Sequence, residues 1–249
     1  MELNRIYNED CLEGMKRIPD GSVDAIVTSP PYNLGGDFHT MSQGKRISYG
    51  GYSESYQDDM EEREYQEWQS EILKECHRVL KDHGVMFYNH KNRIVENSII
   101  SPIEWISKSD FNLMQMVVMN LRSTANVDKR RFFPVHEVIF ILTKNKETKL
   151  NNHFNLTDVW DVSKVKRKVS GHPATFHVEV PKRCIYSSTG EGDIVLDPFM
   201  GSGTTAIACM DTERKYIGFE LDKTYYEKSL ERIKNHTTQT DIFDVLEGN

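Results

Sequence analysis

The feature that most constrains this sequence is the segment Asp197–Thr205, DPFMGSGTT, which follows an apolar run and precedes a helical pattern. Glycines at 201 and 203 let the backbone turn sharply and approach a ligand where a side chain would collide. The helix that follows points free N–H groups at that ligand, which favours a carboxylate or a phosphate. Nineteen residues after Gly201, at the end of the next apolar run, Glu220 is placed to accept hydrogen bonds from ribose hydroxyls. The segment therefore predicts an α/β domain with a nucleotide-like ligand at one edge of its sheet.

Apolar runs typical of strands alternate with helical patterns along the chain, which favours a mainly parallel sheet covered by helices. Two connections, residues 33–60 and 144–178, are too long for ordinary turns, and such loops are usually functional or disordered. The tail 235–249 is expected to be frayed. Strands are predicted at 5–8, 23–28, 84–89, 112–121, 135–143, 193–197 and 215–220, and helices near 11–18, 61–81, 102–109, 179–188, 203–212 and 223–234.

A second motif, Thr28–Tyr32 with the sequence TSPPY, ends the predicted strand 23–28. Its two prolines fix φ and remove two N–H donors, so the carbonyls of Ser29 and Pro30 project as acceptors beside the Ser29 hydroxyl. Tyr32 adds a flat aromatic face. Such an array could hold the two protons of an exocyclic amino group while the ring of that group stacks on Tyr32. An ordinary proline turn is the alternative for this motif alone.

Composition excludes several classes of protein. The four cysteines form no CxxC pair and no Cys/His cluster has metal spacing, so neither a disulfide framework nor a metal site is predicted. A GxxxxGK[ST] motif is absent, which disfavours an NTPase of the P-loop kind. No apolar run approaches the length that crosses a bilayer, and the first twenty residues do not resemble a signal peptide. We therefore expect no membrane association and a cytoplasmic location.

The two motifs together resemble the DNA amino-methyltransferases that use S-adenosylmethionine, which methylate N4 of cytosine or N6 of adenine. Their order, with the proline motif first and the glycine loop last, is similar to that of the circularly permuted β group. Shorter matches are Asn8–Cys11, Arg131–Glu137 and Gly171–Phe176. The resemblance implies a Rossmann-like, mostly parallel sheet with helices on both faces. It also implies a single catalytic domain over 1–249, with a mobile loop at about 33–60 and a small target-recognition insertion at about 144–170.

The resemblance also assigns site residues. A base flipped out of the helix would stack on Tyr32 while Ser29 and the Pro30 carbonyl hold its amino group. The amine would then attack the sulfonium methyl directly. Ring-carbon methylation of cytosine is disfavoured because none of the four cysteines follows a proline. The implied catalytic residues are Ser29, Pro30, Pro31 and Tyr32. The implied cofactor-binding residues are Asp10, Cys11, His172, Pro173, Asp197, Pro198, Phe199, Gly201, Ser202, Gly203, Thr204, Thr205 and Glu220.

Several alternatives remain open at this stage. Serine as the first residue of SPPY favours N4 of cytosine, and N6 of adenine is the alternative. Gly201-x-Gly203-x-x-Ala206 also fits the dinucleotide fingerprint of a nicotinamide or flavin oxidoreductase, but that interpretation leaves Thr28–Tyr32 unexplained. A nucleic-acid-binding module without catalysis and a methylase of RNA or protein are further hypotheses. Protein glutamine methylases place the glycine loop first, the opposite order.

Basic residues gather between Leu121 and Arg183, where thirteen Lys and Arg face six Asp and Glu in a chain of net charge −7. Such a face suits a phosphate backbone, so duplex DNA is the expected partner. A homodimer and a cognate restriction endonuclease are further expected partners of a prokaryotic or phage-encoded enzyme. The expected DNA-binding residues are Arg122, Lys129, Arg130, Arg131, Lys164, Lys166, Arg167 and Lys168.

Overall fold

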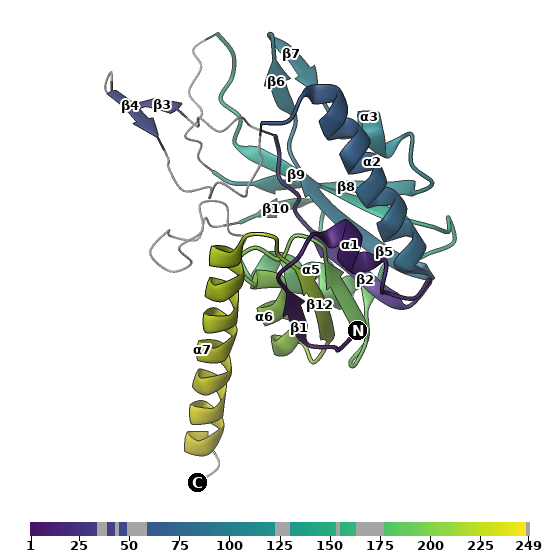
Figure 1. Ribbon diagram of the computed structural model, residues 1–249, viewed down its shortest axis with the longest axis vertical. Helices are drawn as coiled ribbons and strands as arrows, with labels where there is room; N and C mark the ends of the chain where they lie inside the picture. The colour runs from purple at the N-terminus through teal and green to yellow at the C-terminus, as the bar shows by residue number, and fades with distance from the viewer. Residues whose placement is uncertain are drawn as a thin grey trace.

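The computed structural model of the chain describes residues 1–33, 39–42, 45–48, 59–122, 130–152, 155–162 and 177–247 (Figure 1). Its centre is an eight-stranded sheet in the order β1-β12-β11-β2-β5-β9-β8-β10. Every neighbouring pair is parallel except those made by β9, which runs antiparallel to both β5 and β8. The predicted mostly parallel α/β sheet is therefore confirmed. The strands are β1 (Arg5–Tyr7), β2 (Val23–Thr28), β5 (Leu80–His90), β8 (Asn112–Asn120), β9 (His136–Thr143), β10 (Val159–Asp161), β11 (Ile194–Asp197) and β12 (Lys215–Phe219).

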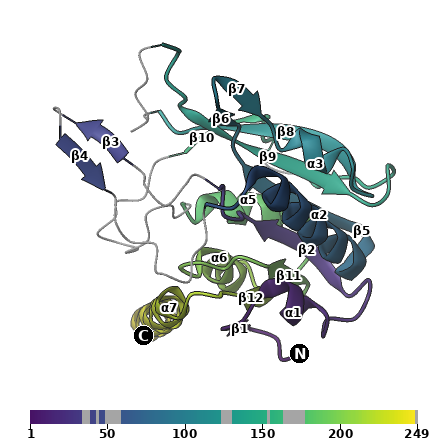
Figure 2. The ribbon, with the colours of Figure 1, turned by 45° about the horizontal axis from the view of Figure 1, so that its top comes forward.

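Helices cover both faces of this sheet and create two apolar cores. In β2 the side chain of Ile26 enters one core while those of Ala25 and Val27 enter the other, as the two-residue period of a strand requires. The first core also contains buried residues of α1, α2 and α3, and the second contains those of α5 and α6 (Figure 2). The helices are α1 (Cys11–Met15), α2 (Glu62–Val79), α3 (Ile103–Ile106), α5 (Glu179–Ser188), α6 (Thr204–Asp211) and α7 (Lys223–Glu247).

Helix α2 follows directly from its sequence. Glu61 caps it by accepting hydrogen bonds from the backbone N–H groups of Arg63 and Glu64, and acidic residues in the first turn suit the helix dipole. Its residues Ile72, Leu73, Cys76 and Val79 are fully buried, which confirms the predicted apolar face. None of the described helices is long and apolar enough to cross a membrane.

Three elements differ from the sequence predictions. A hairpin of β6 (Arg93–Val95) and β7 (Ser98–Ile100) forms where no strand was predicted. Its turn residues Glu96 and Asn97 both have positive φ, a geometry that glycine usually marks in the sequence. A second hairpin, β3 (His39–Ser42) with β4 (Lys45–Ser48), lies inside the predicted loop 33–60.

The prediction of a frayed tail was wrong for most of its length. Helix α7 continues to Glu247 and extends away from the sheet to the C-terminus (Figure 1). Residues 223–247 contain neither glycine nor proline, so nothing in the local sequence ends the helix. The polar, acidic composition had indicated disorder, but it does not by itself stop a helix.

Gly14 allows α1 to pack against the sheet, and this makes a test of the fold. A Cβ at Gly14 would lie 2.1 Å from the ring of the fully buried Phe219. We expect Gly14→Ala to lower the free energy of unfolding by about 1–3 kcal/mol, because a packed core must shift to admit the methyl group. Urea denaturation measures this change.

Gly190→Ala is the matched control for that measurement. The nearest atom to its new Cβ is Asp193 Oδ2 at 3.7 Å, so we expect a change within about 0.5 kcal/mol. Equal effects of the two substitutions would contradict the packing assigned to Gly14.

Candidate active site

The two motifs singled out in the sequence lie at the same edge of the sheet. The Ser29 turn follows β2, and the glycine loop follows β11, which is the parallel neighbour of β2 with Val195 opposite Ala25. Parallel neighbours deliver their carboxyl ends to one edge, where open α/β sheets bind ligands. The structure therefore brings together two segments that are far apart in the chain, since 169 residues separate Thr28 from Asp197.

The Asp197 carboxylate joins these motifs directly. Its Oδ1 accepts hydrogen bonds from the Thr28 hydroxyl at 2.8 Å and from the Phe199 N–H at 3.0 Å, and its Oδ2 accepts one from the Thr205 hydroxyl at 2.6 Å. Burial raises the pKa of Asp197 to about 6, because the charged form is removed from water. The three donors oppose that shift by stabilising the charge.

The glycine loop has the backbone that its sequence requires. Gly201 and Gly203 have φ of 53° and 80°, in the left-handed region that glycine favours. A Cβ on Gly203 would lie 3.2 Å from Ser229 Cβ, so this glycine makes room for α7. From α7, Arg232 donates hydrogen bonds to the Ser202 carbonyl and to the hydroxyls of Ser202 and Thr204. The loop is thus fixed in place by a long helix.

Glu220 lies beside this loop at the end of β12. Its Oε2 accepts a hydrogen bond from the Gly201 N–H and its Oε1 one from the Asp222 N–H, both at 2.8 Å. Burial raises the pKa of Glu220 to about 7. A carboxylate has about four acceptor positions, so two remain for hydroxyl donors of a ligand. A buried acid beside a glycine turn is a donor set that fits the ribose of a nucleoside cofactor.

Other predicted cofactor residues have structural contacts of their own. Asp10 caps α1, where its Oδ1 accepts hydrogen bonds from the backbone N–H groups of Leu12 and Glu13. Burial raises the pKa of the Cys11 thiol well above its usual value, so this thiol stays neutral. The Phe199 ring meets the edge of Trp68 from α2, with centroids 5.5 Å apart.

The Tyr32 hydroxyl lies in a polar cluster at the start of the same edge. It is 2.8 Å from the Ser29 hydroxyl, 2.5 Å from Asn89 Nδ2 and 3.3 Å from Glu137 Oε2. Burial raises the pKa of the Tyr32 phenol well above its usual value, so the hydroxyl keeps its proton. One face of the half-buried Tyr32 ring packs on His90, with centroids 4.6 Å apart.

Helix α2 fixes the proline turn from the other side. The Tyr65 hydroxyl donates to the Pro31 carbonyl at 2.7 Å, so its own oxygen accepts from Gln69 Nε2 at 2.9 Å and from His90 Nε2 at 2.7 Å. Burial lowers the pKa of His90 to about 3, which keeps the imidazole neutral. The Pro31 carbonyl is therefore held in place and is not free to receive a ligand.

Sequence reasoning missed four residues of this cluster as site residues: Tyr65, Asn89, His90 and Glu137. Glu137 was noted only as part of a strand near the target base, and His90 was assigned to the core or the surface. They lie in strand and helix patterns with no motif of their own. The only available signal was polar residues at the ends of apolar runs.

The expected DNA-binding residues are only partly described. Arg122 forms an ion pair with Asp161 at 3.5 Å, and Arg130 is exposed before β9. Arg131 is half-buried. Lys129, Lys164, Lys166, Arg167 and Lys168 lie outside the described residues, as do the expected cofactor residues His172 and Pro173.

The predicted insertion 144–170 does not begin near the motifs. Because β9 is antiparallel, Thr143 pairs with Val85 near the start of β5, at the opposite edge from Ser29. There Lys144 donates to the Leu80 carbonyl at 2.7 Å. The chain returns to the edge of the motifs only at β10, where Asp161 pairs with Asn120.

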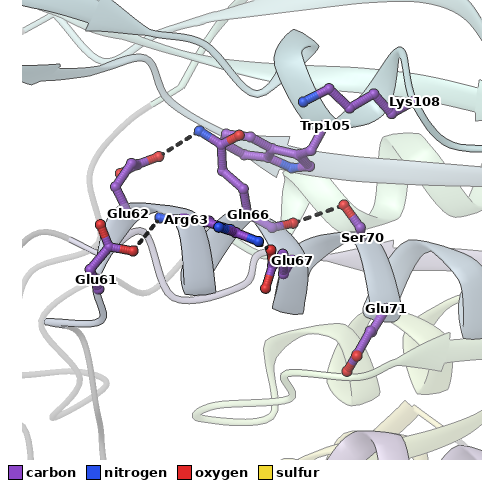
Figure 3. Close-up of a pocket in the computed structure, with 9 residues that line it drawn as sticks. All are labelled: Glu61, Glu62, Arg63, Gln66, Glu67, Ser70, Glu71, Trp105 and Lys108. Atoms are coloured by element: carbon purple, nitrogen blue, oxygen red, sulfur yellow. Dashed lines mark hydrogen bonds and ion pairs between the residues drawn. The ribbon is translucent and has the colours of Figure 1, made fainter.

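A hollow of about 760 Å³ on the outer face of α2 is a separate feature (Figure 3). Four glutamates line it together with Arg63, Gln66, Ser70, Trp105 and Lys108, and no motif residue takes part. Its acidic lining is unsuited to phosphates. Within the described part of the chain, no group of His, Cys, Asp and Glu could hold a metal ion.

The Asp197 bridge predicts the effect of removing one donor. Thr28→Val keeps the shape of the side chain but removes the hydroxyl, so a buried carboxylate loses one hydrogen bond. We expect the free energy of unfolding to fall by about 1–3 kcal/mol in urea denaturation. Thr28→Ser keeps the hydroxyl and should lose only about 1 kcal/mol, the contribution of one methyl group. A larger loss in the serine variant would show that packing, not the hydrogen bond, dominates.

Comparisons with known proteins agree with this geometry. A family model described as DNA methylase matches residues 23–231. The type II methyltransferase M.HpaI of Haemophilus parainfluenzae is 29% identical over 96% of this chain and 77% of its own length. The DNA adenine methyltransferase YhdJ of Escherichia coli (strain K12) is 28% identical over 93% of this chain and 83% of its own length.

Solved structures share the fold. PvuII DNA methyltransferase (cytosine-N4-specific) matches with a TM-score of 0.74 at 22% identity, covering 98% of this chain and 93% of that one. A DNA modification methylase from Thermus thermophilus, solved with S-adenosyl-L-methionine, matches with a TM-score of 0.69 at 20% identity, covering 93% of each chain. This chain therefore belongs to the DNA methylase family and is an enzyme that transfers a methyl group from S-adenosylmethionine to an exocyclic amino group of DNA.

Proposed function

We propose that the target of this enzyme is N4 of cytosine. The observation that carries the proposal is the Ser29 hydroxyl, which opens the proline turn and lies 2.8 Å from the Tyr32 hydroxyl in the polar cluster. A hydroxyl there accepts one amino proton, and serine in this position favours cytosine. The cytosine-N4-specific PvuII enzyme shares the fold, while YhdJ, named as an adenine enzyme, supports N6 of adenine as the second candidate.

In this proposal the base leaves the DNA helix and stacks on the exposed face of Tyr32. His90 supports the opposite face of the ring, and Lys91 Nζ lies 5.2 Å from its centroid. Ser29 and the Pro30 carbonyl accept the amino protons, which localises the nitrogen lone pair and aims it outward. S-adenosylmethionine supplies a methyl group on a positively charged sulfur. Because Asp197 fixes the turn relative to the glycine loop, positioning accounts for most of the rate enhancement.

The cofactor would lie along the ends of β1, β12 and β11. Glu220 would accept the ribose hydroxyls and Asp10 would face the adenine, while the loop N–H groups and the start of α6 face the methionine end. The remaining predicted residues of the loop shape this site: Asp197, Pro198, Phe199, Gly201, Ser202, Gly203, Thr204 and Thr205.

Duplex DNA would cross the edge that carries the Ser29 turn. Arg122, Arg130 and Arg131 follow β8 or precede β9 at this edge, and Asp161 ends β10 there. Such residues would hold phosphates, which position the duplex without reading its sequence. Relatives named type II methyltransferases support a cognate restriction endonuclease as a companion. A homodimer remains part of the proposal.

Nucleoside mass spectrometry tests the target base. Unmethylated plasmid is incubated with the enzyme and methyl-labelled S-adenosylmethionine, then digested to nucleosides. We expect the label in N4-methylcytosine. Label in N6-methyladenine would overturn the assignment of the base and leave the mechanism intact, and label in neither nucleoside would contradict the proposed reaction.

The pKa of Glu220 predicts how cofactor binding depends on pH. With a pKa of about 7, the carboxyl ionises as pH rises through neutrality, and the ionised form is the better acceptor for ribose hydroxyls. We expect the association constant for S-adenosylmethionine to rise by up to about tenfold from about pH 6 to about pH 8. Isothermal titration calorimetry measures it.

Glu220→Gln is the control for this pH dependence. It should bind more weakly and lose the part of the pH dependence that belongs to the carboxyl, while titration of the ligand itself affects both proteins equally. The same pH dependence in the two proteins would contradict a role for Glu220 in ribose binding.

A further inference from the structure

The polar cluster around Tyr32 ends in a charge that the proline motif does not explain. Ser29, Tyr32 and Glu137 form a continuous chain of contacts, with 2.8 Å between the two hydroxyls and 3.3 Å from Tyr32 to Glu137 Oε2. Asn89 touches all three members through its Nδ2. The four side chains come from the turn after β2, the end of β5 and the start of β9.

The donors and acceptors in this cluster can be assigned. Glu137 has only acceptors, so the Asn89 amide must turn its N–H group toward the carboxylate, 3.2 Å away. The same N–H₂ group donates to the Tyr32 oxygen. The proton of Tyr32 is therefore available for Glu137, and the proton of Ser29 for Tyr32. The hydroxyl protons point in one direction, from Ser29 through Tyr32 to Glu137.

This orientation leaves a cost at Asn89. Its Oδ1 is buried and has no hydrogen-bond partner among the described residues. A buried acceptor without a partner typically costs about 1–3 kcal/mol. Turning the amide over would pair that oxygen only by placing the other face of the amide against a carboxylate. The amide thus keeps its costly orientation because Glu137 is charged.

Methylation of an amine requires an acceptor for a proton. As the nitrogen forms its bond to the methyl group, the S–C bond breaks and its electron pair stays on sulfur. The nitrogen then carries a positive charge and one proton more than the product. That N–H bond must break, and its electron pair must return to nitrogen.

We propose that Glu137 is the final acceptor of this proton, reached through the hydroxyls of Ser29 and Tyr32. Ser29 takes the proton from the amine and passes its own to Tyr32, which passes its own to Glu137. The result is a neutral methylated amine and a protonated Glu137, which returns the proton to solvent after product release. Asn89 is a positioning residue that orders the chain. This inference rests on the proposed contact between the amine and Ser29.

The neighbouring His90 does not serve as this acceptor. Its Nε2 donates to Tyr65, whose only proton is used by the Pro31 carbonyl, and its Nδ1 accepts from the Lys91 N–H at 2.9 Å. Both ring nitrogens are therefore engaged on the side away from the Ser29 hydroxyl. Glu137 also places a negative charge near the nitrogen as positive charge develops there, which lowers the barrier to transfer.

Single-turnover methylation tests the proposal, with the enzyme saturated by duplex DNA and S-adenosylmethionine. We expect Glu137→Gln to slow methyl transfer by about a hundredfold or more, as for other losses of a proton acceptor. The dissociation constant for DNA and the fluorescence of 2-aminopurine at the target position should stay within about twofold of wild type. Added formate should accelerate Glu137→Ala, since a small carboxylate can replace the missing acceptor.

Tyr32→Phe tests the route of the proton. It keeps the ring but breaks the chain of hydroxyls, so it should slow transfer about as much as Glu137→Gln, and the double variant should lose little more. Glu104→Gln, at the start of α3, is the matched control and should behave as wild type.

The results that would overturn the proposal are distinct from failure of the proposed function. A wild-type enzyme that methylates neither base refutes the function itself. An active wild type with Glu137→Gln within about threefold of its rate refutes the proton acceptor. Loss of the 2-aminopurine signal without rescue by formate would show that Glu137 only supports Tyr32, and a normal rate for Tyr32→Phe refutes the route.

Discussion

The structure of the site depends on one buried carboxylate. Asp197 ends β11, and its two oxygens accept hydrogen bonds from Thr28 in β2, from Thr205 in α6 and from the Phe199 N–H. Removing a charge from water is unfavourable unless donors replace the lost hydration. The chain supplies those donors from both motifs. Separation of the motifs would leave the charge without partners, so the carboxylate fixes the distance between the amine side and the cofactor side of the reaction.

The second constraint acts on the same turn from the opposite direction. Helix α2 belongs to the core on one face of the sheet, and its Tyr65 donates to the Pro31 carbonyl. The turn is thereby attached to β11 through Thr28 and to α2 through Pro31. An in-line displacement tolerates little error in the position of the nucleophile. Two prolines and two anchors on separate elements meet that requirement more securely than a free loop would.

Sequence alone predicted the parts of the site that depend on local backbone. The glycine loop and the proline turn have residue types that few other geometries require, and the strands that carry them are continuous apolar runs. Asn89 and Glu137 could not be found in this way, because they meet Tyr32 only through the pairing of β5 with β9. The reason for Gly203 was also hidden, since the atom that excludes its Cβ belongs to Ser229 in α7.

The antiparallel direction of β9 has a functional consequence. A strand parallel to β5 would bring its last residue, Thr143, to the edge where Ser29 lies, and its first residues to the far edge. Because β9 runs the other way, His136 and Glu137 arrive at the edge of the motifs, and Lys144 leaves at the opposite one. The same reversal that sends the start of the predicted insertion away from the site brings a carboxylate to Tyr32. Strand direction, more than order along the chain, decides which residues can take part in the chemistry.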